Sequence, residues 1–294
     1  MPWLQVILDT EAQYVEEISD GLVAMGAICV TLQDGADQAL YEPPLNTTPL
    51  WKRTQIVGLF DEDKIDGLTL PVQLQSVLAP LPLPSIQCQR LEDQEWTQRS
   101  MSDFHPMQFG HRVWICPSWT PPPQPQAVNI FLDPGLAFGT GTHATTALCL
   151  EWLEQQGDWS NKVLIDYGCG SGILAITAAK LGATQVWAVD IDPQALYATQ
   201  ANAGKNQVTL QINATLPTQL PHLKVDGLIA NILATPLIEL APTLADYLKP
   251  TAPIVLSGIL KEQTQAVIAA YTPHFTLIDV TERDNWMRIV ATKL

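Results

Sequence analysis

The stretch from Val163 to Asp192 constrains the fold of this chain more than any other segment. It begins with an apolar, β-branched run that ends in Asp166, as a buried parallel strand would. Three glycines follow at alternate positions, Gly168, Gly170 and Gly172. They allow a sharp turn against which a ligand can lie. A helical pattern comes next, and a second apolar run ends in Asp190. The stretch therefore predicts a strand, a glycine turn, a helix and a strand within an α/β sheet.

A unit of this kind binds a cofactor that contains adenosine. The glycine turn passes beneath the cofactor, and the acid that closes the second strand, Asp190, accepts hydrogen bonds from the ribose hydroxyls. A dinucleotide would require a glycine at the position of Ile173, so the G-x-G-x-G spacing favours S-adenosylmethionine over a nicotinamide cofactor. A third interpretation, in which the glycines serve only tight packing, stays open at this point.

The composition is that of a globular protein with 294 residues, of which 47% are hydrophobic, and this length has room for about two domains. The first residues lack the basic start of a signal peptide, and no apolar run reaches the ~18 residues that span a bilayer. We therefore expect a cytoplasmic monomer that makes no membrane contact. Five cysteines without C-x-x-C spacing argue against a zinc site, and no other metal site is expected.

The charge balance bears on the partner. Thirty acidic residues against fifteen basic ones give a net charge of −15. Such a surface repels phosphate backbones, which argues against direct nucleic-acid binding and favours a basic protein as the partner. The alternative, in which the charge only keeps the protein in solution, stays open.

Residues 1–92 follow the order β-α-β-β-α-β of a ferredoxin-like α+β fold. Thr10 and Gln13 are spaced as a capping box at the start of the first helix. The expected strands are Trp3–Leu8, Ala27–Leu32, Gln55–Phe60 and Ile86–Leu91, and the second helix is Leu68–Leu78. The segment contains no glycine loop and no nucleophile constellation. It is therefore predicted to be a substrate-recognition domain.

Residues 93–126 are interpreted as a connector between two domains. The connector begins with a polar stretch typical of a helix, continues through a strand at Trp114 and Ile115, and ends in the proline-rich link Trp119–Gln126. His105 and His111 lie on either side of a proline and a glycine, which favours surface positions over metal ligation. Residues 127–294 form the second predicted domain.

The second domain opens with a glycine-rich segment, Ile130–Thr146, that runs into a helix. It lacks the lysine of a phosphate-binding loop, so we interpret it as a lid over the cofactor. Phe138 is then a candidate apolar wall, and Thr145 a hydroxyl that faces the ligand. His143 is a candidate base, although a capping or packing role is the stronger interpretation.

Five more strands complete the predicted sheet of the second domain. They are Val208–Ile212, Gly227–Ile232, Ile254–Gly258, Phe275–Val280 and Trp286–Ala291. A parallel sheet of seven strands that ends in a hairpin is the class I methyltransferase variant of the Rossmann-like fold. Asn231 ends one of these strands at the sheet edge where such folds place their chemistry, and its side-chain carbonyl can accept from an amine. The alternative is an asparagine that satisfies turn backbone groups.

Several segments together resemble the PrmA family, bacterial methyltransferases of large-subunit ribosomal protein eleven. They are DPGLAFGTGTHATT, IDYGCGSGILAI, VDIDPQA, ANILA and LSGIL. The resemblance covers essentially the whole chain. It implies an enzyme that uses S-adenosylmethionine to trimethylate lysine side chains and the N-terminal amino group of that ribosomal protein, free of the ribosome. The cofactor site that it implies contains Thr145, Gly168, Asp190 and Asn231, and the glycine turn adds Gly170.

The sequence departs from the family pattern at Ser100, where tryptophan is usual, and at Ala144, where proline is frequent. Neither residue touches the inferred cofactor groups, so the departures concern docking more than activity. We expect in-line methyl transfer to a neutral amine that is oriented by carbonyls of Asn231–Leu233, without an essential general base. Two other classes are an RNA or small-molecule methyltransferase, disfavoured because Asn231 does not open an N-P-P-Y motif, and a non-enzymatic assembly factor that binds no cofactor.

Overall fold

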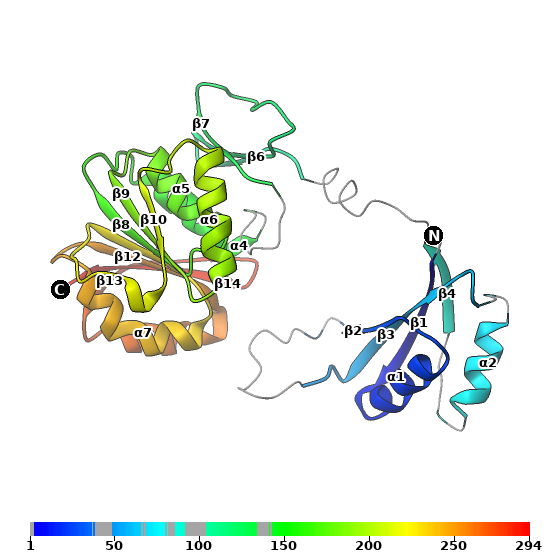
Figure 1. Ribbon diagram of the computed structural model, residues 1–294. Coiled ribbons are helices and arrows are strands. Elements are labelled where there is room, and N and C mark those ends of the chain that lie inside the picture. Colours follow the sequence, from blue (N-terminus) through cyan, green and yellow to red (C-terminus); the bar gives the residue numbers. More distant parts are fainter. Residues whose placement is uncertain are drawn as a thin grey trace. The chain divides into compact units, whose positions relative to one another are not determined.

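The computed structural model describes residues 3–36, 38, 49–65, 67, 69–79, 81, 86–91, 104–133, 141 and 143–294. The chain divides into two compact units, Met1–Arg99 and Ser100–Leu294, each with a hydrophobic core (Figure 1). Within the described ranges, every helix is too short or too polar to span a membrane.

The first unit is a four-stranded sheet in the order β2-β3-β1-β4, with antiparallel neighbours throughout. This order and connectivity confirm the predicted ferredoxin-like fold. Alternate residues of β1 are buried against the helices, as in a strand that turns one face to the core. The elements are β1 (Trp3–Glu11), α1 (Val15–Ala24), β2 (Cys29–Asp34), β3 (Arg53–Asp61), α2 (Leu70–Val77) and β4 (Ile86–Leu91).

The predicted capping box at Thr10 and Gln13 is wrong. Strand β1 continues to Glu11, so Thr10 pairs with Thr54 and is buried in the sheet. Its hydroxyl is thereby held away from the helix. The chain enters α1 through a single 3₁₀ turn, Ala12–Tyr14, without a side-chain cap. The pairing with β3 therefore prevails over the local capping pattern.

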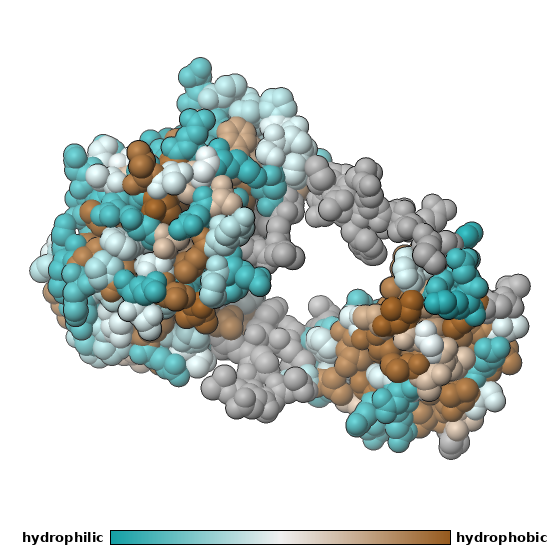
Figure 2. Space-filling view, in the orientation of Figure 1, coloured by the Kyte–Doolittle hydropathy of each residue, from teal (hydrophilic) through white to brown (hydrophobic). Residues whose placement is uncertain are grey.

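Apolar side chains reach the surface of the first unit on the side that carries its helices. Val23, in the last turn of α1, and Ile28, directly before β2, are each 58% exposed, and Val72 and Val77 of α2 are also exposed. The face visible in Figure 2 accordingly shows hydrophobic side chains over these helices. Such side chains are suited to contact with another protein.

The second unit contains a seven-stranded sheet in the order β10-β9-β8-β11-β12-β14-β13. The first five strands in this order are parallel, and β14 lies antiparallel between β12 and β13. The predicted seven strands with a closing hairpin are confirmed. The strands are β8 (Val163–Tyr167), β9 (Gln185–Val189), β10 (Ile212–Thr215), β11 (Gly227–Asn231), β12 (Pro253–Leu260), β13 (Phe275–Arg283) and β14 (Trp286–Lys293).

Helices cover both faces of this sheet (Figure 1). Residues of α4, α5 and α6 pack in one apolar cluster, and residues of α7 and α8 pack in a second. The sheet is thus doubly wound, and its strands are apolar nearly throughout because neither face meets water. The helices are α4 (Ala144–Gln155), α5 (Ile173–Lys180), α6 (Pro193–Lys205), α7 (Ala234–Tyr247) and α8 (Thr264–Tyr271).

The third strand of this sheet begins later than the predicted Val208–Ile212. After α6 the chain makes a turn in which Gln207 has a positive φ of 61° and the Val208 amide donates to the Ala203 carbonyl at 3.0 Å. Ile212 is the first residue to pair with β9. The first part of the apolar run that predicted the strand therefore belongs to the turn that ends α6.

A small sheet precedes the large one. Its strands are β5 (Met107–Phe109), β6 (Val113–Cys116) and β7 (Val128–Phe131), with β6 between the other two. Phe109, Val113 and Ile115 pack in the same cluster as α4 and α5. The described residues from 104 to 126, which the sequence had assigned to the connector, thus belong to the second compact unit.

Candidate functional site

The turn that follows β8 has a backbone that only glycine adopts without strain. Gly168, Gly170 and Gly172 have φ values of 83°, 53° and 80°. A Cβ added at Gly168 would overlap Cγ2 of Ile232, and one at Gly172 would lie 2.8 Å from Cγ2 of Thr199. The turn is therefore a tight cradle at the carboxyl edge of the sheet.

Two polar side chains of α6 hold this turn. Thr199 Oγ1 donates to the Gly170 carbonyl at 3.1 Å, and Asn202 Nδ2 donates to the Ser171 carbonyl at 2.9 Å. Thr199 is fully buried. We did not predict either residue from the sequence. The only sequence feature that links Thr199 and Asn202 is their spacing of three residues, which places both on the same face of the helix, here the face directed at the glycine turn.

Asp190 lies just beyond β9, beside the glycine turn. Its Oδ2 accepts from the Gly170 amide at 2.9 Å, and its Oδ1 accepts from the Asp192 amide at 3.0 Å. The residue is half-buried, and each carboxylate oxygen retains capacity for a further hydrogen bond. The next residue, Ile191, is 81% exposed, so an apolar side chain is accessible at the position after Asp190. This arrangement fits a ligand with hydroxyls next to a flat apolar group.

Asp166, at the end of β8, is a second acid, which we did not predict as a site residue from the sequence. Its Oδ2 accepts from the Ala175 amide at 2.9 Å, whereas its fully buried Oδ1 has no hydrogen-bond partner among the described residues. Burial raises the pKa of Asp166 to about 7, the Ala175 hydrogen bond opposes this shift, and the charge of Asp190 adds to it. The sequence feature that could have identified Asp166 is its position, as an acid at the end of the strand that precedes the glycine turn.

The start of α4 brings His143 and Thr145 to the same edge. His143 is the N-cap, and its Nδ1 accepts from the Thr145 amide at 3.4 Å and lies 2.8 Å from the Thr145 hydroxyl. The ring also makes an edge contact with Trp286, with 4.9 Å between ring centroids. Burial lowers the pKa of His143, which favours the neutral ring that accepts at Nδ1. The structure thus gives His143 the capping role.

Asn231 ends β11 and is half-buried. Its Nδ2 donates to the hydroxyl of Thr146 at 3.3 Å. The side-chain amide nitrogen of Asn231 points to α4, so its amide oxygen, on the other branch of the side chain, points away from α4. This hydrogen bond joins the start of α4 to the end of β11.

Five predicted cofactor residues thus lie at one edge of the large sheet. They are Thr145, Gly168, Gly170, Asp190 and Asn231. Their roles stay predictions. Phe138 and the rest of the predicted lid from 134 to 140 lie outside the described residues. The residues present fit an adenosine cofactor with a cationic end, because the glycine cradle excludes side chains and a buried carboxylate oxygen of Asp166 has no partner.

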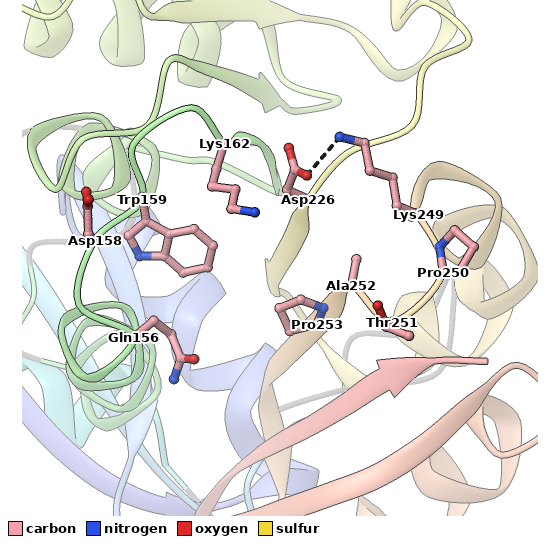
Figure 3. Close-up of a pocket in the computed structure, with 10 residues that line it drawn as sticks. All are labelled: Gln156, Asp158, Trp159, Lys162, Asp226, Lys249, Pro250, Thr251, Ala252 and Pro253. Atoms are coloured by element: carbon pink, nitrogen blue, oxygen red, sulfur yellow. Dashed lines mark hydrogen bonds and ion pairs between the residues drawn. The ribbon is translucent and has the colours of Figure 1, made fainter.

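A pocket of about 320 Å³ lies at the opposite, amino-terminal edge of the sheet (Figure 3). Figure 3 shows the Lys162 side chain beside the ring of Trp159. Asp226 accepts from the Val163 amide at 2.9 Å and pairs with Lys249 at 2.8 Å. Burial acts to raise the pKa of Asp226, but these two hydrogen bonds lower it overall. The acid of the wall, Asp226, is thus matched within the protein.

Metal ligation has no visible basis in the described part of the chain. No group of three or more His, Cys, Asp or Glu side chains there is close enough to hold an ion. The cysteines are free thiols, and burial raises the pKa of Cys149 to about 12.

Comparisons with known proteins agree with the geometry of the carboxyl edge. The family model described as ribosomal protein L11 methyltransferase (PrmA) matches residues 2–294. A ribosomal protein L11 methyltransferase of Cellvibrio japonicus is 50% identical over 294 residues, covering 100% of this chain and 99% of the relative. That of Nitrosococcus oceani is 50% identical over 291 residues, covering 99% of both chains.

A solved structure is also similar. The crystal structure of a ribosomal protein L11 methylase from Lactobacillus delbrueckii subsp. bulgaricus aligns with a TM-score of 0.59 and 32% identity. The alignment covers 65% of this chain and 99% of the other. Together with the glycine cradle and the acids at the ends of β8 and β9, the full-length family match leads to one conclusion. This chain belongs to the ribosomal protein L11 methyltransferase family.

Proposed function

We propose that this protein transfers methyl groups from S-adenosylmethionine to amines of ribosomal protein L11, namely lysine side chains and the N-terminal amino group, up to the trimethylated state. The observation that carries the proposal is the meeting of Gly168, Asp190 and Asn231 at one sheet edge. It occurs in a chain that the family matches almost from end to end.

The cofactor would be held by the carboxyl edge of β8 and β9. The cradle at Gly168 and Gly170 leaves room for close backbone approach, and the free acceptor capacity of Asp190 suits two ribose hydroxyls. Thr145 and Asn231 border the same edge from α4 and β11. When bound, the cofactor supplies an activated methyl group on a sulfonium.

The methyl acceptor would be a neutral amine at the end of β11. A lysine with a pKa of ~10.4 is neutral in only about one molecule in 2,500 at pH 7. The amide oxygen of Asn231, left free by the bond of its nitrogen to Thr146, can accept from that amine and orient it. His143 Nδ1 is already used as a helix cap, which supports a reaction without a general base.

Substrate choice would lie with the first unit. Its described residues carry exposed apolar side chains on α1 and α2, and residues 1–92 are accordingly proposed as the recognition domain. Residues 127–294 are proposed as the catalytic domain. Residues 93–126 precede it in the chain, and their described part, 104–126, packs with it in the second compact unit. The net charge of −15 supports a basic protein as the substrate, bound free of the ribosome and without direct contact to nucleic acid.

Cellular context follows from the same proposal. A protein that modifies a ribosomal protein works where ribosomes are assembled, so a cytoplasmic location is proposed. The proposed active form is a monomer.

The test is a methylation assay with purified protein, isotope-labelled S-adenosylmethionine and recombinant ribosomal protein L11. Mass spectrometry should find mass gains in multiples of three methyl groups on lysine and N-terminal amines. A protein that binds the cofactor and leaves L11 unlabelled would refute the substrate. A protein that does not bind the cofactor would refute the reaction and leave the non-enzymatic assembly factor as the better account.

A further inference from the structure

Ile232, the residue after Asn231, lies between two glycines that are distant in sequence. A Cβ added at Gly168, in the turn after β8, would overlap Cγ2 of Ile232 and lie 3.6 Å from its Cβ. A Cβ added at Gly258, in β12, would overlap the Ile232 carbonyl oxygen and lie 2.7 Å from its carbonyl carbon. One glycine thus leaves space for the side chain of Ile232, and the other leaves space for its main chain.

The position of Gly258 is set by a β-bulge. Strands β11 and β12 pair in regular parallel register up to Asn231 and Ser257. On the other side of β12, the pairing with β14 shifts between Leu256 and Ile259, so that Ser257 and Gly258 oppose the single residue Arg288. Gly258 takes up this extra residue with a φ of 84°. Bulges bend a strand locally and are frequent beside active sites.

The bulge is anchored within the sheet. The fully buried hydroxyl of Ser257 donates to the Met287 carbonyl at 3.1 Å, directly before Gly258. Arg288, also buried, donates to the Leu148 carbonyl of α4 at 3.1 Å. These bonds fix the bulge against both β14 and α4. The surface that Ile232 contacts is therefore rigid.

We propose that Gly168 and Gly258 form a clamp on Ile232 that sets the position of the Asn231–Leu233 segment, and hence of the methyl acceptor, relative to the cofactor. Gly258 is then a positioning residue, because it acts through Ile232 and touches neither reactant. The inference rests on the proposed function.

The clamp has a direct chemical consequence. Methyl transfer in line requires the amine close to the methyl carbon, and a misplacement of about 1 Å can cost about 100-fold in rate. A side chain at 258 would displace the Ile232 peptide and shift both flanking residues. The predicted cofactor residues Gly170 and Asp190, which lie in the turns after β8 and β9, would stay in place, whereas Asn231 would move with Ile232. The reaction rate should therefore change far more than cofactor affinity, to which Asn231 is one of five predicted contributors.

The chain offers a matched control for backbone strain. Gly157 has a φ of 82°, close to the 84° of Gly258, but a Cβ added there meets nothing within 4 Å. Gly157→Ala and Gly258→Ala therefore impose similar left-handed strain, and only the second imposes the contact with Ile232. The difference between the two variants therefore measures the effect of the contact with Ile232.

The experiment measures kcat and KM for L11 methylation, the dissociation constant for S-adenosylmethionine, and the fractions of mono-, di- and trimethylated product. We expect Gly258→Ala to lower kcat at least about 10-fold below Gly157→Ala, with product shifted to lower methylation states. The cofactor dissociation constants should agree within about threefold. Equal kcat and equal product distributions in the two variants would overturn the clamp.

A second variant covers the case in which Gly258→Ala does not fold. Ile232→Ala removes the half-buried side chain that fills the space above Gly168 and keeps the main chain intact. It should lower kcat and the trimethylated fraction while cofactor affinity is retained. Wild-type turnover with a wild-type product distribution would overturn the clamp. Inactivity of the wild type itself would instead refute the proposed function.

Discussion

The two edges of the seven-stranded sheet differ in how their charges are matched. At the amino-terminal edge, Asp226 is paired with Lys249 and accepts from the Val163 amide. At the carboxyl edge, Asp166 and Asp190 accept only from backbone amides, and no cation among the described residues contacts them. Among the described residues, the acid at the amino-terminal edge is paired with a cation, and the two acids at the carboxyl edge are not.

The pocket of Figure 3 lies at the edge where the acid is paired with a lysine. A hollow alone does not mark a binding site. The better indicator is polar groups that the fold leaves without partners, because such groups cost free energy unless a ligand satisfies them. Four predictions test this distinction.

Asp190→Ala should have the largest effect. If the carboxylate accepts from two ribose hydroxyls, its loss removes two charge-assisted hydrogen bonds of about 1.5–3 kcal/mol each. The dissociation constant for S-adenosylmethionine, measured by isothermal titration calorimetry, should rise about 100-fold or more. Asp226→Ala, an acid removed from the opposite edge, should keep the constant within about threefold. Equal losses in both variants would remove the distinction between the edges.

Asp166→Asn should change the pH dependence of stability. The folded-state pKa of about 7 lies above the unfolded value, so the folded protein binds an extra proton between these two values. The contribution of protonated Asp166 to the stability of the wild type is therefore present at low pH and is lost as pH rises toward 7. Asparagine mimics the protonated acid, so the Tm of the variant relative to wild type should rise by several degrees between pH 5 and pH 8. A constant Tm difference would contradict the raised pKa.

Asp226→Asn should have a smaller effect of the opposite pH sense. The pKa of Asp226 is lowered in the fold, so its stabilisation is present above the unfolded pKa and is lost as the solution becomes more acidic. The substitution weakens one partly exposed ion pair and should reduce the free energy of unfolding by about 1 kcal/mol at pH 7. Urea unfolding should show a smaller difference at pH 3, and an equal difference would contradict this assignment.

Lys162→Gln should have the smallest effect. The side chain is exposed and has no hydrogen bond or ion pair in the described part of the chain. Its replacement should change the free energy of unfolding by less than about 0.5 kcal/mol and leave methyl transfer to L11 unchanged. A loss of methyl transfer would give the pocket at the amino-terminal edge a functional role.

Local patterns predicted much of this structure from the sequence. The strand at Trp3–Leu8 and the glycine turn after the strand that ends in Asp166 are predicted from neighbouring residues only, and both are confirmed. The two errors have different causes. Thr10 is part of β1 because it pairs with the distant strand β3, whereas the strand predicted after Asn206 is shortened by a local turn that closes α6.

The parts of the site that the sequence did not predict depend on sheet register. The bulge at Gly258 exists because β14 pairs with β12 in two offsets, and Thr199 reaches Gly170 only through the packing of α6. The lack of a hydrogen-bond partner for Oδ1 of Asp166 likewise depends on the residues packed around it. No periodicity in the chain encodes these contacts.

The order β12-β14-β13 has a consequence for synthesis. On the ribosome β12 and β13 emerge before β14, the strand that must lie between them. Until β14 is made, β12 presents an open apolar edge and β13 has no neighbour in the sheet. The nascent domain thus passes through a state with an exposed pairing edge, which favours aggregation. We expect holdase chaperones to bind the nascent chain most strongly between the emergence of β13 and that of β14.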